Sequence, residues 1–282
     1  MKKITRRSFM AAAGLTVAAL ALTACGGSSS TASSAAASSV ASSAAASSEA
    51  ASAAATELTT VEAGKLTMAT NAAFPPYEMT TDAGEFEGID IETAQAIADK
   101  LGLELQIDDM DFDAALLSVQ QGKADIVMAG VTVTDERKAV MDFSDSYATG
   151  IQSIIVPEGS DIASPDALAG KKIGTQRGTT GYIYCSDDFG DENVVAYDDG
   201  LTAVQALNNG QVDAVVIDNA PAKEFVAANP GLVILDTSYA EEDYAIGMAK
   251  GSSLEDAVNA VLEELKADGT LQSIVDKYIT AE

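Results

Sequence analysis

The sequence predicts an α/β fold in which mostly parallel sheets are flanked by helices. One reason is that short β-rich runs alternate with segments of helical periodicity from Leu58 to Glu282, and such alternation is typical of largely parallel sheets. A second reason is an internal repeat of helix, turn and strand, which indicates two similar lobes. A chain of 282 residues also has room for one or two domains with sizeable cores.

Eight runs rich in apolar and β-branched side chains are predicted to be strands. In chain order they are KLTMATN (65–71), LELQIDDM (103–110), ADIVMAG (124–130), QSIIVPE (152–158), KKIGTQR (171–177), NVVAYD (193–198), VDAVVID (212–218) and LVILD (232–236).

Helical periodicity fills the intervals between these strands. IETAQAIADKLG (91–102) places its apolar residues on one face and ends at Gly102. SPDALAG (164–170) has a serine at the N-cap and a proline at the first helical position. Further helices are predicted at FDAALLSVQQGK (112–123), after RGTT (177–180), at GLTAVQALNNG (200–210) and NAPAKEFVAANP (219–230), and as two helices within 254–279 that are broken at Gly269.

The internal repeat joins residues 116–130 (LLSVQQGKADIVMAG) and 203–218 (AVQALNNGQVDAVVID). Both copies consist of a helix, an amide-glycine turn, an aspartate, a buried strand and a polar strand end. Ligands of open α/β sheets bind at the carboxyl ends of the strands. We therefore expect Gly130, Thr132 and Asp218 to face one shared cleft.

Composition argues against several functions. The formal net charge is -27, and so acidic a surface repels nucleic acid. The chain has no histidine, which removes the commonest general base and the commonest zinc ligand. Cys25 and Cys185 are too few for a metal cluster or a disulfide framework. We therefore predict no nucleic-acid partner, no metal, no cofactor and no catalytic residue.

The first 57 residues indicate export and anchoring. A basic start, MKKITRRSFM, precedes an apolar run that is shorter than the roughly 20 residues of a transmembrane helix. LTAC, ending at Cys25, resembles the lipobox of bacterial lipoproteins; the alternative is an ordinary secretion signal with an incidental cysteine. Residues 1–24 are thus a predicted signal peptide, with the Sec or twin-arginine route left open, and 25–57 a lipidated cysteine with a Ser/Ala-rich tether.

Five segments resemble the family-3 solute-binding proteins of polar amino-acid ABC transporters. They occur in the family's order and spacing, and the resemblance covers the chain from about Leu66 to Tyr278. The segments are TNAAFPPYEM (70–79), FDAALLSVQQGKADIVMAGVTVTDERKAVMDFSDSY (112–147), GKKIGTQRGTTG (170–181), VDAVVIDNAPA (212–222) and DGTLQSIVDKY (268–278).

This resemblance implies a two-lobed periplasmic-binding-protein-like fold of type II, in which two crossover strands join the lobes. Lobe 1 would be 58–147 with 247–282, lobe 2 would be 152–242, and the hinge 148–151 with 243–246. The lobes would close on a free amino acid and deliver it to the permease subunits of an ABC importer. We expect a monomer on the outer face of the bacterial cell membrane, held there by the lipid on Cys25.

A free amino acid carries an α-carboxylate and an α-ammonium. Arg137 suits the first because a guanidinium binds a carboxylate through two parallel hydrogen bonds. By resemblance, Thr132 and the Gly130 carbonyl assist from the same lobe. Alternatively, Arg137 only pairs with Asp135 or Asp142.

The second lobe and two aromatic residues complete the site that the resemblance implies. Thr179 and Thr180 would add N–H donors at a positive helix end, and Asp218 would bind the ammonium. Phe74 and Phe112 would pack on the ligand side chain. The alternatives are helix capping for Thr179, Thr180 and Asp218, and a core role for the phenylalanines.

Other charged residues are expected to lie outside the site. Arg177 is expected to be solvated or at the rim. Cys185 is expected to be a small, semi-buried filler. The acidic runs DDMDFD (108–113), CSDDFGDE (185–192) and AEEDY (240–244) are expected to be solvated faces.

Specificity is predicted from two neutral pocket candidates, Asn71 and Gln176. Relatives that bind cationic or amide side chains often have an aspartate at the position of Asn71. Because burying an unpaired ligand charge is costly, these residues favour a polar, uncharged ligand side chain. The alternative is a cationic ligand that is neutralised by Glu78, Asp109 or Asp111.

Two other functions fit the same fold. One is an enzyme, since some dehydratases of aromatic amino-acid synthesis resemble this family; without histidine, a carboxylate or lysine would have to transfer protons. The other is a sensory ectodomain, which needs a spanning helix after the lobes, whereas this sequence ends at Glu282. Solute binding for transport is the prediction that the motifs favour.

Overall fold

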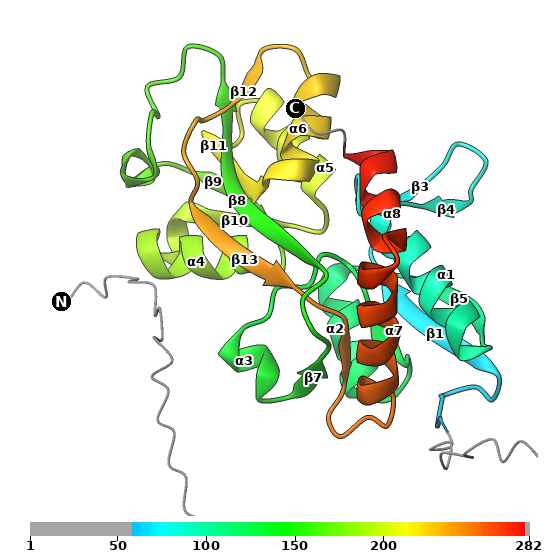
Figure 1. Cartoon of the computed structure of the whole chain (residues 1–282). Coiled ribbons are helices and arrows are strands. Elements are labelled where there is room, and N and C mark those ends of the chain that lie inside the picture. Colours follow the sequence, from blue (N-terminus) through cyan, green and yellow to red (C-terminus); the bar gives the residue numbers. More distant parts are fainter. Residues whose placement is uncertain (1–57, 280–282) are drawn as a thin grey trace, which may run out of the picture. The chain divides into compact units, whose positions relative to one another are not determined.

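The computed structural model describes residues 58–279, in which two main β-sheets are covered by helices (Figure 1). The predicted signal peptide, Cys25 and the predicted tether lie outside the described residues. In the described part of the chain, every helix is too short or too polar to span a bilayer.

The first sheet has the strand order β5–β1–β6–β14–β7. β1 runs parallel to β5 and β6, whereas β14 runs antiparallel to both of its neighbours. Five of the six β1 residues are buried, as expected for a strand that is covered on both faces. The strands are β5 (Glu104–Asp109), β1 (Lys65–Thr70), β6 (Ile126–Val127), β14 (Gly247–Ala249) and β7 (Met141–Phe143).

Two helices, α1 (Ile89–Leu101) and α2 (Phe112–Gln120), pack against strands of this sheet, and α7 (Glu255–Ala267) and α8 (Thr270–Tyr278) pack against α1. The apolar face of α1 is buried. The helix is followed by Gly102 at a φ of 70°, a left-handed conformation that glycine adopts readily. A short helix, α3 (Asp135–Lys138), lies between β6 and β7 in the chain.

The second sheet has the order β10–β9–β11–β8–β12, and β13 also pairs with β8. β10, β9 and β11 are parallel, whereas β8 is antiparallel to β11, β12 and β13. The strands are β10 (Val194–Tyr197), β9 (Ile173–Gln176), β11 (Ala214–Asp218), β8 (Ala148–Pro157), β12 (Leu232–Ile234) and β13 (Ala240–Tyr244). The accompanying helices are α4 (Thr180–Phe189), α5 (Gly200–Asn208) and α6 (Asn219–Ala228), with 3-10 turns η1 (Pro165–Leu168) and η2 (Asp191–Asn193).

β8 and β13 are the strands that lead from one sheet to the other. They pair from Ala148 opposite Tyr244 to Ala240 opposite Gln152. β13 and the residue after it also bond to the loop that follows β6, through Val133 N–H to the Asp243 carbonyl and Ala245 N–H to the Val131 carbonyl. This crossover region is therefore joined by backbone hydrogen bonds to the first sheet's loop as well as to β8.

A third, small sheet consists of β2 (Ala73–Phe74), β3 (Glu78–Thr80) and β4 (Phe86–Glu87). It follows directly after β1 in the chain and contacts α1 through β3 and β4. The hairpin of β2 and β3 pairs Phe74 with Glu78. These two side chains are thereby held next to the carboxyl end of β1.

The α/β prediction is confirmed, and each of the eight predicted strands overlaps an observed one. The sheets are mixed rather than mostly parallel, because β14 and β8 run against their neighbours. Of the predicted helix 164–170, only the 3-10 turn η1 (Pro165–Leu168) is observed, and Ser164 makes no side-chain capping bond. The sequence analysis did not identify the short elements β2, β3, β4, β7, β13, β14 and α3.

The two sheets divide the described residues much as the two predicted lobes do, and β8 and β13 contain the predicted hinge residues 148–151 and 243–244. The described residues nevertheless belong to one compact unit. The lobe boundaries and the hinge therefore stay predictions.

Candidate functional site

All ten residues that the sequence analysis assigns to a ligand site line one pocket. The pocket lies where β1, β6, β9 and β11 end, that is, at the carboxyl ends of parallel strands in both sheets, where α/β proteins bind ligands. The ten residues are Asn71, Phe74, Phe112, Gly130, Thr132, Arg137, Gln176, Thr179, Thr180 and Asp218.

The pocket has two halves, one built on the first sheet and the other on the second. Arg137 is buried on α3, and its guanidinium donates to carbonyl groups of both halves. Nη1 donates to the Thr132 carbonyl at 2.7 Å and Nη2 to the Gly178 carbonyl at 3.1 Å. The guanidinium carbon also lies 5.4 Å from the centroid of the Phe112 ring. Because a guanidinium has five N–H donors, donors remain for a ligand anion.

The predicted alternative for Arg137, an ion pair with Asp135 or Asp142, is wrong. Within residues 58–279, no carboxylate forms an ion pair with this guanidinium, and Asp142 pairs with Lys250 at 2.6 Å. Thr134 caps α3 by accepting a hydrogen bond from the Arg137 N–H. The cap fixes the backbone from which the side chain enters the pocket.

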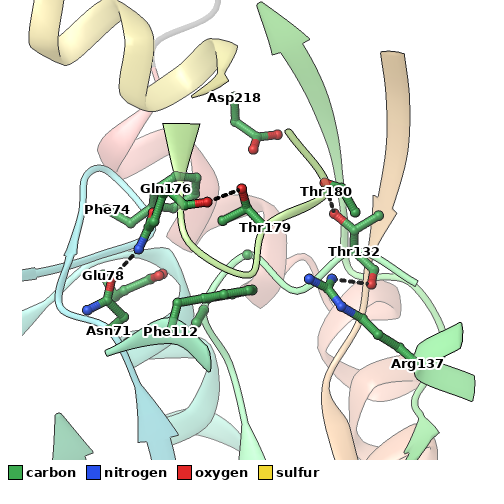
Figure 2. A pocket seen from close by; sticks show the side chains of 12 residues that line it. Asn71, Phe74, Glu78, Phe112, Thr132, Arg137, Gln176, Thr179, Thr180 and Asp218 are labelled. Carbon is green, nitrogen blue, oxygen red and sulfur yellow. Dashed lines mark hydrogen bonds between the residues drawn. The ribbon is translucent and has the colours of Figure 1, made fainter. Parts of the chain in front are cut away.

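Asp218 ends β11 and enters the pocket on the side opposite Arg137 in Figure 2. It occupies the N-cap position of α6 but makes no side-chain capping bond, so the capping alternative is wrong for its carboxylate. Oδ2 accepts a hydrogen bond from Gln152 Nε2 at 2.7 Å, while Oδ1 makes no well-aligned hydrogen bond among the described residues, although the buried Tyr244 hydroxyl interacts with this carboxylate. Burial, together with the nearby Glu242 carboxylate, raises the pKa of Asp218 to about 7.

Thr179 is the N-cap of α4, which confirms the capping alternative for its side chain. Its Oγ1 accepts from Tyr182 N–H at 3.3 Å and donates to the Gln176 carbonyl at 2.8 Å. Thr180 is the first residue of the helix. Since the first N–H groups of a helix have no intrahelical partner and lie at its positive end, this helix start offers donors to an anion in the pocket.

The hydroxyls of Thr132 and Thr180 meet between the two halves of the pocket, 3.5 Å apart (Figure 2). Both donate to Oε2 of Glu242, from Thr132 at 3.2 Å and from Thr180 at 2.9 Å. Gln152 Nε2 donates to the same oxygen at 3.0 Å. Glu242 thus binds one hydroxyl from each half.

Asn71 and Gln176 are hydrogen-bonded to each other across the pocket. Gln176 Nε2 donates to Asn71 Oδ1 at 2.8 Å, and Asn71 Nδ2 donates to the Met110 carbonyl at 2.9 Å (Figure 2). Both side chains are buried. This pair places neutral amide groups, rather than charges, at one end of the pocket.

Phe74 and Phe112 are buried and form apolar walls of the pocket. Phe74 also packs in the larger hydrophobic cluster, where it stacks against Tyr77, and Phe112 packs in the cluster under α2. Both phenylalanines therefore belong to the hydrophobic core and also line the pocket. Apolar walls lower the local dielectric and strengthen ionic contacts inside the pocket.

Glu78 is a carboxylate of the pocket that is 0% exposed. Neither of its oxygens accepts a hydrogen bond from an N–H or hydroxyl group among the described residues, but the Glu78 carboxyl lies within hydrogen-bonding reach of the Asp90 carboxyl. Burial and the adjacent Asp90 carboxyl raise its pKa well above the usual value. Of the three acidic residues that could neutralise a cationic ligand, Glu78 alone lines the pocket, while Asp109 Oδ1 accepts the Ala72 N–H.

Asp90, on α1, lies behind Glu78 and is also 0% exposed. Its Oδ2 accepts from Gly130 N–H at 3.0 Å and from the Tyr147 hydroxyl at 2.8 Å. Burial raises the pKa of Asp90 to about 6. Asp90 thereby holds the Gly130 peptide, a predicted ligand-binding group, in place.

Two residues near the ligand space were missed. Ala129 lines the pocket, but a small apolar side chain gives no chemical signal in a sequence. Glu242 lies in AEEDY, for which a solvated face was expected; this prediction is wrong for Glu242 and Tyr244, which are buried, and right for Glu241 and Asp243, which are exposed. The two-residue alternation of a strand was the available signal.

The remaining predictions concern residues away from the pocket. Arg177 is exposed and pairs with Asp198 at 3.3 Å, as expected for a solvated residue. Cys185 is fully buried in the cluster beneath α4, a more complete burial than expected.

Comparison with known proteins places this pocket in a functional context. Residues 66–281 match the family model of bacterial extracellular solute-binding proteins, family 3. The L-cystine-binding protein TcyJ of Escherichia coli (strain K12) is 32% identical, over 78% of this chain and 85% of the relative. The arginine-binding extracellular protein ArtP of Bacillus subtilis (strain 168) is also 32% identical, over 77% of this chain and 87% of the relative.

A solved structure agrees with these relatives. The amino acid ABC transporter substrate-binding protein AbpA of Streptococcus pneumoniae Canada MDR_19A, bound to L-arginine, is 38% identical. The match covers 76% of this chain and 94% of AbpA, with a TM-score of 0.72. The described fold is therefore that of the type II periplasmic binding proteins.

Proposed function

Because the chain belongs to the family-3 bacterial extracellular solute-binding proteins, we propose that it binds a free amino acid with a cationic side chain, arginine first among them. Proteins of this family bind solutes outside the cytoplasm for ABC transporters and are not enzymes, so the dehydratase alternative is set aside. The chain is an amino-acid-binding protein of such an importer. The identity of the amino acid and the mode of anchoring are the proposal.

Recognition of the amino-acid backbone is assigned to the two charged ends of the pocket. Arg137 offers its remaining N–H donors to the α-carboxylate, assisted by the N–H groups at the start of α4. Asp218 offers Oδ1 to the α-ammonium. Since these residues come from different sheets, the ligand makes its full set of contacts only when both halves of the pocket are together, and this difference favours closure.

The single observation that supports a ligand with a cationic side chain is the buried Glu78. Ionised Glu78 would be a buried carboxylate without a hydrogen-bond donor, which is costly, and it lines the pocket next to the Asp90 carboxyl. A guanidinium or ammonium group of the ligand would supply the missing donors and the opposite charge. The walls formed by Phe74 and Phe112 suit the aliphatic part of such a side chain.

A second candidate is glutamine, favoured by the amide pair of Asn71 and Gln176. A ligand amide could exchange hydrogen bonds with both groups, which agrees with the uncharged side chain predicted from the sequence. Glu78 would then have to be protonated, and its raised pKa makes a neutral carboxyl accessible.

Calorimetric titration of the purified full chain with arginine, lysine, glutamine and cystine tests the proposal. We expect arginine to bind most tightly, and Glu78→Gln to lower arginine affinity by about tenfold or more while glutamine affinity is retained. Glu87→Gln is the matched control, because Glu87 is exposed on the neighbouring strand β4. Tight glutamine binding without arginine binding would reverse the assignment.

Capture and delivery complete the proposal. The lobes 58–147 with 247–282 and 152–242 would close about the hinge at 148–151 and 243–246, and the closed form would dock on the permease. A lipid on Cys25 and the tether 25–57 would hold the monomer on the outer face of the membrane. Cys25→Ser should release the protein from membranes into the medium; retention of this variant in the membrane fraction would exclude lipid anchoring.

A further inference from the structure

Glu242 is a buried carboxylate at the junction of the two sheets that the proposed function does not use. It lies on β13, opposite Gly150 of β8, and is 7% exposed. The residues on either side, Glu241 and Asp243, are exposed. Burial of one acidic residue in an otherwise solvated acidic run indicates that its carboxylate has a specific task.

The contacts of Glu242 are concentrated on one oxygen. Oε2 accepts hydrogen bonds from Thr132 Oγ1, Thr180 Oγ1 and Gln152 Nε2 at 3.2, 2.9 and 3.0 Å. Thr132 and Thr180 both line the pocket. The carboxylate therefore lies behind two hydroxyls that face the ligand space from opposite halves.

The chemistry of a hydroxyl gives these contacts a consequence. A threonine hydroxyl has one hydrogen and two acceptor positions, whereas an ionised carboxylate only accepts. When the hydrogens of Thr132 and Thr180 are donated to Glu242, their oxygens can only accept from the ligand. A charge-assisted bond to a carboxylate is also stronger than the 3.5 Å contact between the two hydroxyls.

Gln152 connects the same carboxylate to Asp218. Its Nε2 donates to Asp218 Oδ2 at 2.7 Å as well as to Glu242 Oε2. Asp218 is the predicted ammonium-binding residue. Gln152 thus links the carboxylate that binds the Thr132 and Thr180 hydroxyls to the carboxylate at the Asp218 end of the pocket.

We propose that Glu242 is a positioning residue that orients the Thr132 and Thr180 hydroxyls as hydrogen-bond acceptors and thereby selects an α-ammonium at this end of the pocket. The inference rests on the proposed function, since it assumes an amino acid as ligand. Glu242 acts through the hydroxyls and does not line the pocket itself. Its substitution should therefore alter the discrimination between ligands with and without the ammonium, beyond any effect on folding.

The experiment compares arginine with 5-guanidinopentanoic acid, which lacks the α-ammonium, by calorimetry on the full chain. Wild type should prefer arginine strongly. Glu242→Gln removes the negative charge and replaces one acceptor oxygen by an N–H donor, so the two hydroxyls lose the charge-assisted bonds that hold their hydrogens away from the pocket. We expect the affinity ratio to fall by about tenfold or more, with the affinity for 5-guanidinopentanoic acid nearly unchanged. Glu241→Gln, which removes the adjacent exposed charge, should leave the ratio unchanged.

The outcomes separate this inference from the proposed function. If wild type binds none of the amino acids, the proposed function fails. If wild type binds arginine but Glu242→Gln keeps the ratio, or lowers both affinities equally, Glu242 is merely structural and the inference is overturned. If glutamine is the ligand, the affinity ratio is measured with glutamine and with 4-carbamoylbutanoic acid, which lacks the α-ammonium.

A second variant keeps the test decisive if Glu242→Gln does not fold. Thr132→Val removes one hydroxyl at almost constant volume, and Thr132→Ser keeps it. We expect the preference for the ammonium to fall in the valine variant and to be retained in the serine variant. An equal preference in both would contradict the role of the hydroxyl.

Discussion

Arg137, on α3, and Asp218, at the end of β11, face the same pocket, one as a buried cation and the other as a buried carboxyl group. The zwitterion of an amino acid carries the complementary charges at its α-carboxylate and α-ammonium. This relationship accounts for an arginine after TVTDE in a chain whose other cations beyond the first ten residues are lysines, apart from Arg177.

Arg137→Ala should weaken ligand binding by about 100-fold or more, because the ligand carboxylate would be left buried and unpaired. Arg137→Lys should recover only part of this loss, since an ammonium cannot form two parallel hydrogen bonds to a carboxylate. Arg177→Ala is the control, as Arg177 is exposed and pairs with Asp198. Calorimetric affinities of the two Arg137 variants that match wild type would contradict the assignment.

Ligand affinity should depend on pH through Asp218, whose pKa of about 7 in the ligand-free pocket results from burial and from Glu242. The ionised form binds the ammonium, so affinity should be full above pH 7 and fall as the carboxylate is protonated, by about tenfold per pH unit well below 7. Titrations in buffers of different ionisation enthalpy should show proton release on binding near pH 6. A constant affinity between pH 5.5 and 8.5 would refute this linkage.

Stability of the ligand-free protein should change with pH in the opposite sense. The pKa of Asp218 in the folded protein lies above the unfolded value of 3.8. The contribution of Asp218 to the free energy of unfolding is therefore full below pH 3.8 and is lost as the pH rises through 7. Each pKa unit corresponds to roughly 1.4 kcal/mol. Asp218→Asn should therefore raise the denaturation midpoint at pH 8 while it weakens binding, and the exposed Asp236→Asn should do neither. A midpoint for Asp218→Asn at or below wild type would contradict the burial cost.

Gly150→Ala should disturb the crossover strands. A Cβ at this position would lie 2.5 Å from the Tyr244 ring and 2.6 Å from Asp218 Oδ1. We expect a loss of about 1–3 kcal/mol in the free energy of unfolding and weaker ligand binding, because Asp218 must move. Chemical denaturation checks the first effect, with Thr149→Ala at an exposed position of the same strand as control. Wild-type stability of Gly150→Ala would contradict this expectation, because it would show that the crossover strands accommodate the added Cβ without a loss of stability.

The sequence predicted the pocket better than it predicted the details around it. Gly130, Thr132 and Asp218 follow or end strands, and the topology of parallel strands collects such residues at one place. The other seven residues were implied by the resemblance to a known family. The hairpin of β2 and β3 was missed because strands of two or three residues give no periodicity. Its position explains why Glu78 was only an alternative, since burial of that carboxylate depends on packing against α1 and Asp90.

Glu242 shows the corresponding limit for charged runs. An acidic segment is solvated in most proteins, yet the alternation of a strand turns every second side chain inward. Nothing in AEEDY reveals that Thr132, Thr180 and Gln152 converge on this strand. Such convergence follows from tertiary structure alone.

The most direct test of the central claim is a crystal structure of the protein with arginine bound. The account predicts the α-carboxylate on the Arg137 guanidinium, the α-ammonium on Asp218 and the ligand guanidinium at Glu78, all within the one pocket. An arginine bound elsewhere, or bound in this pocket without contact to both Arg137 and Asp218, would contradict it.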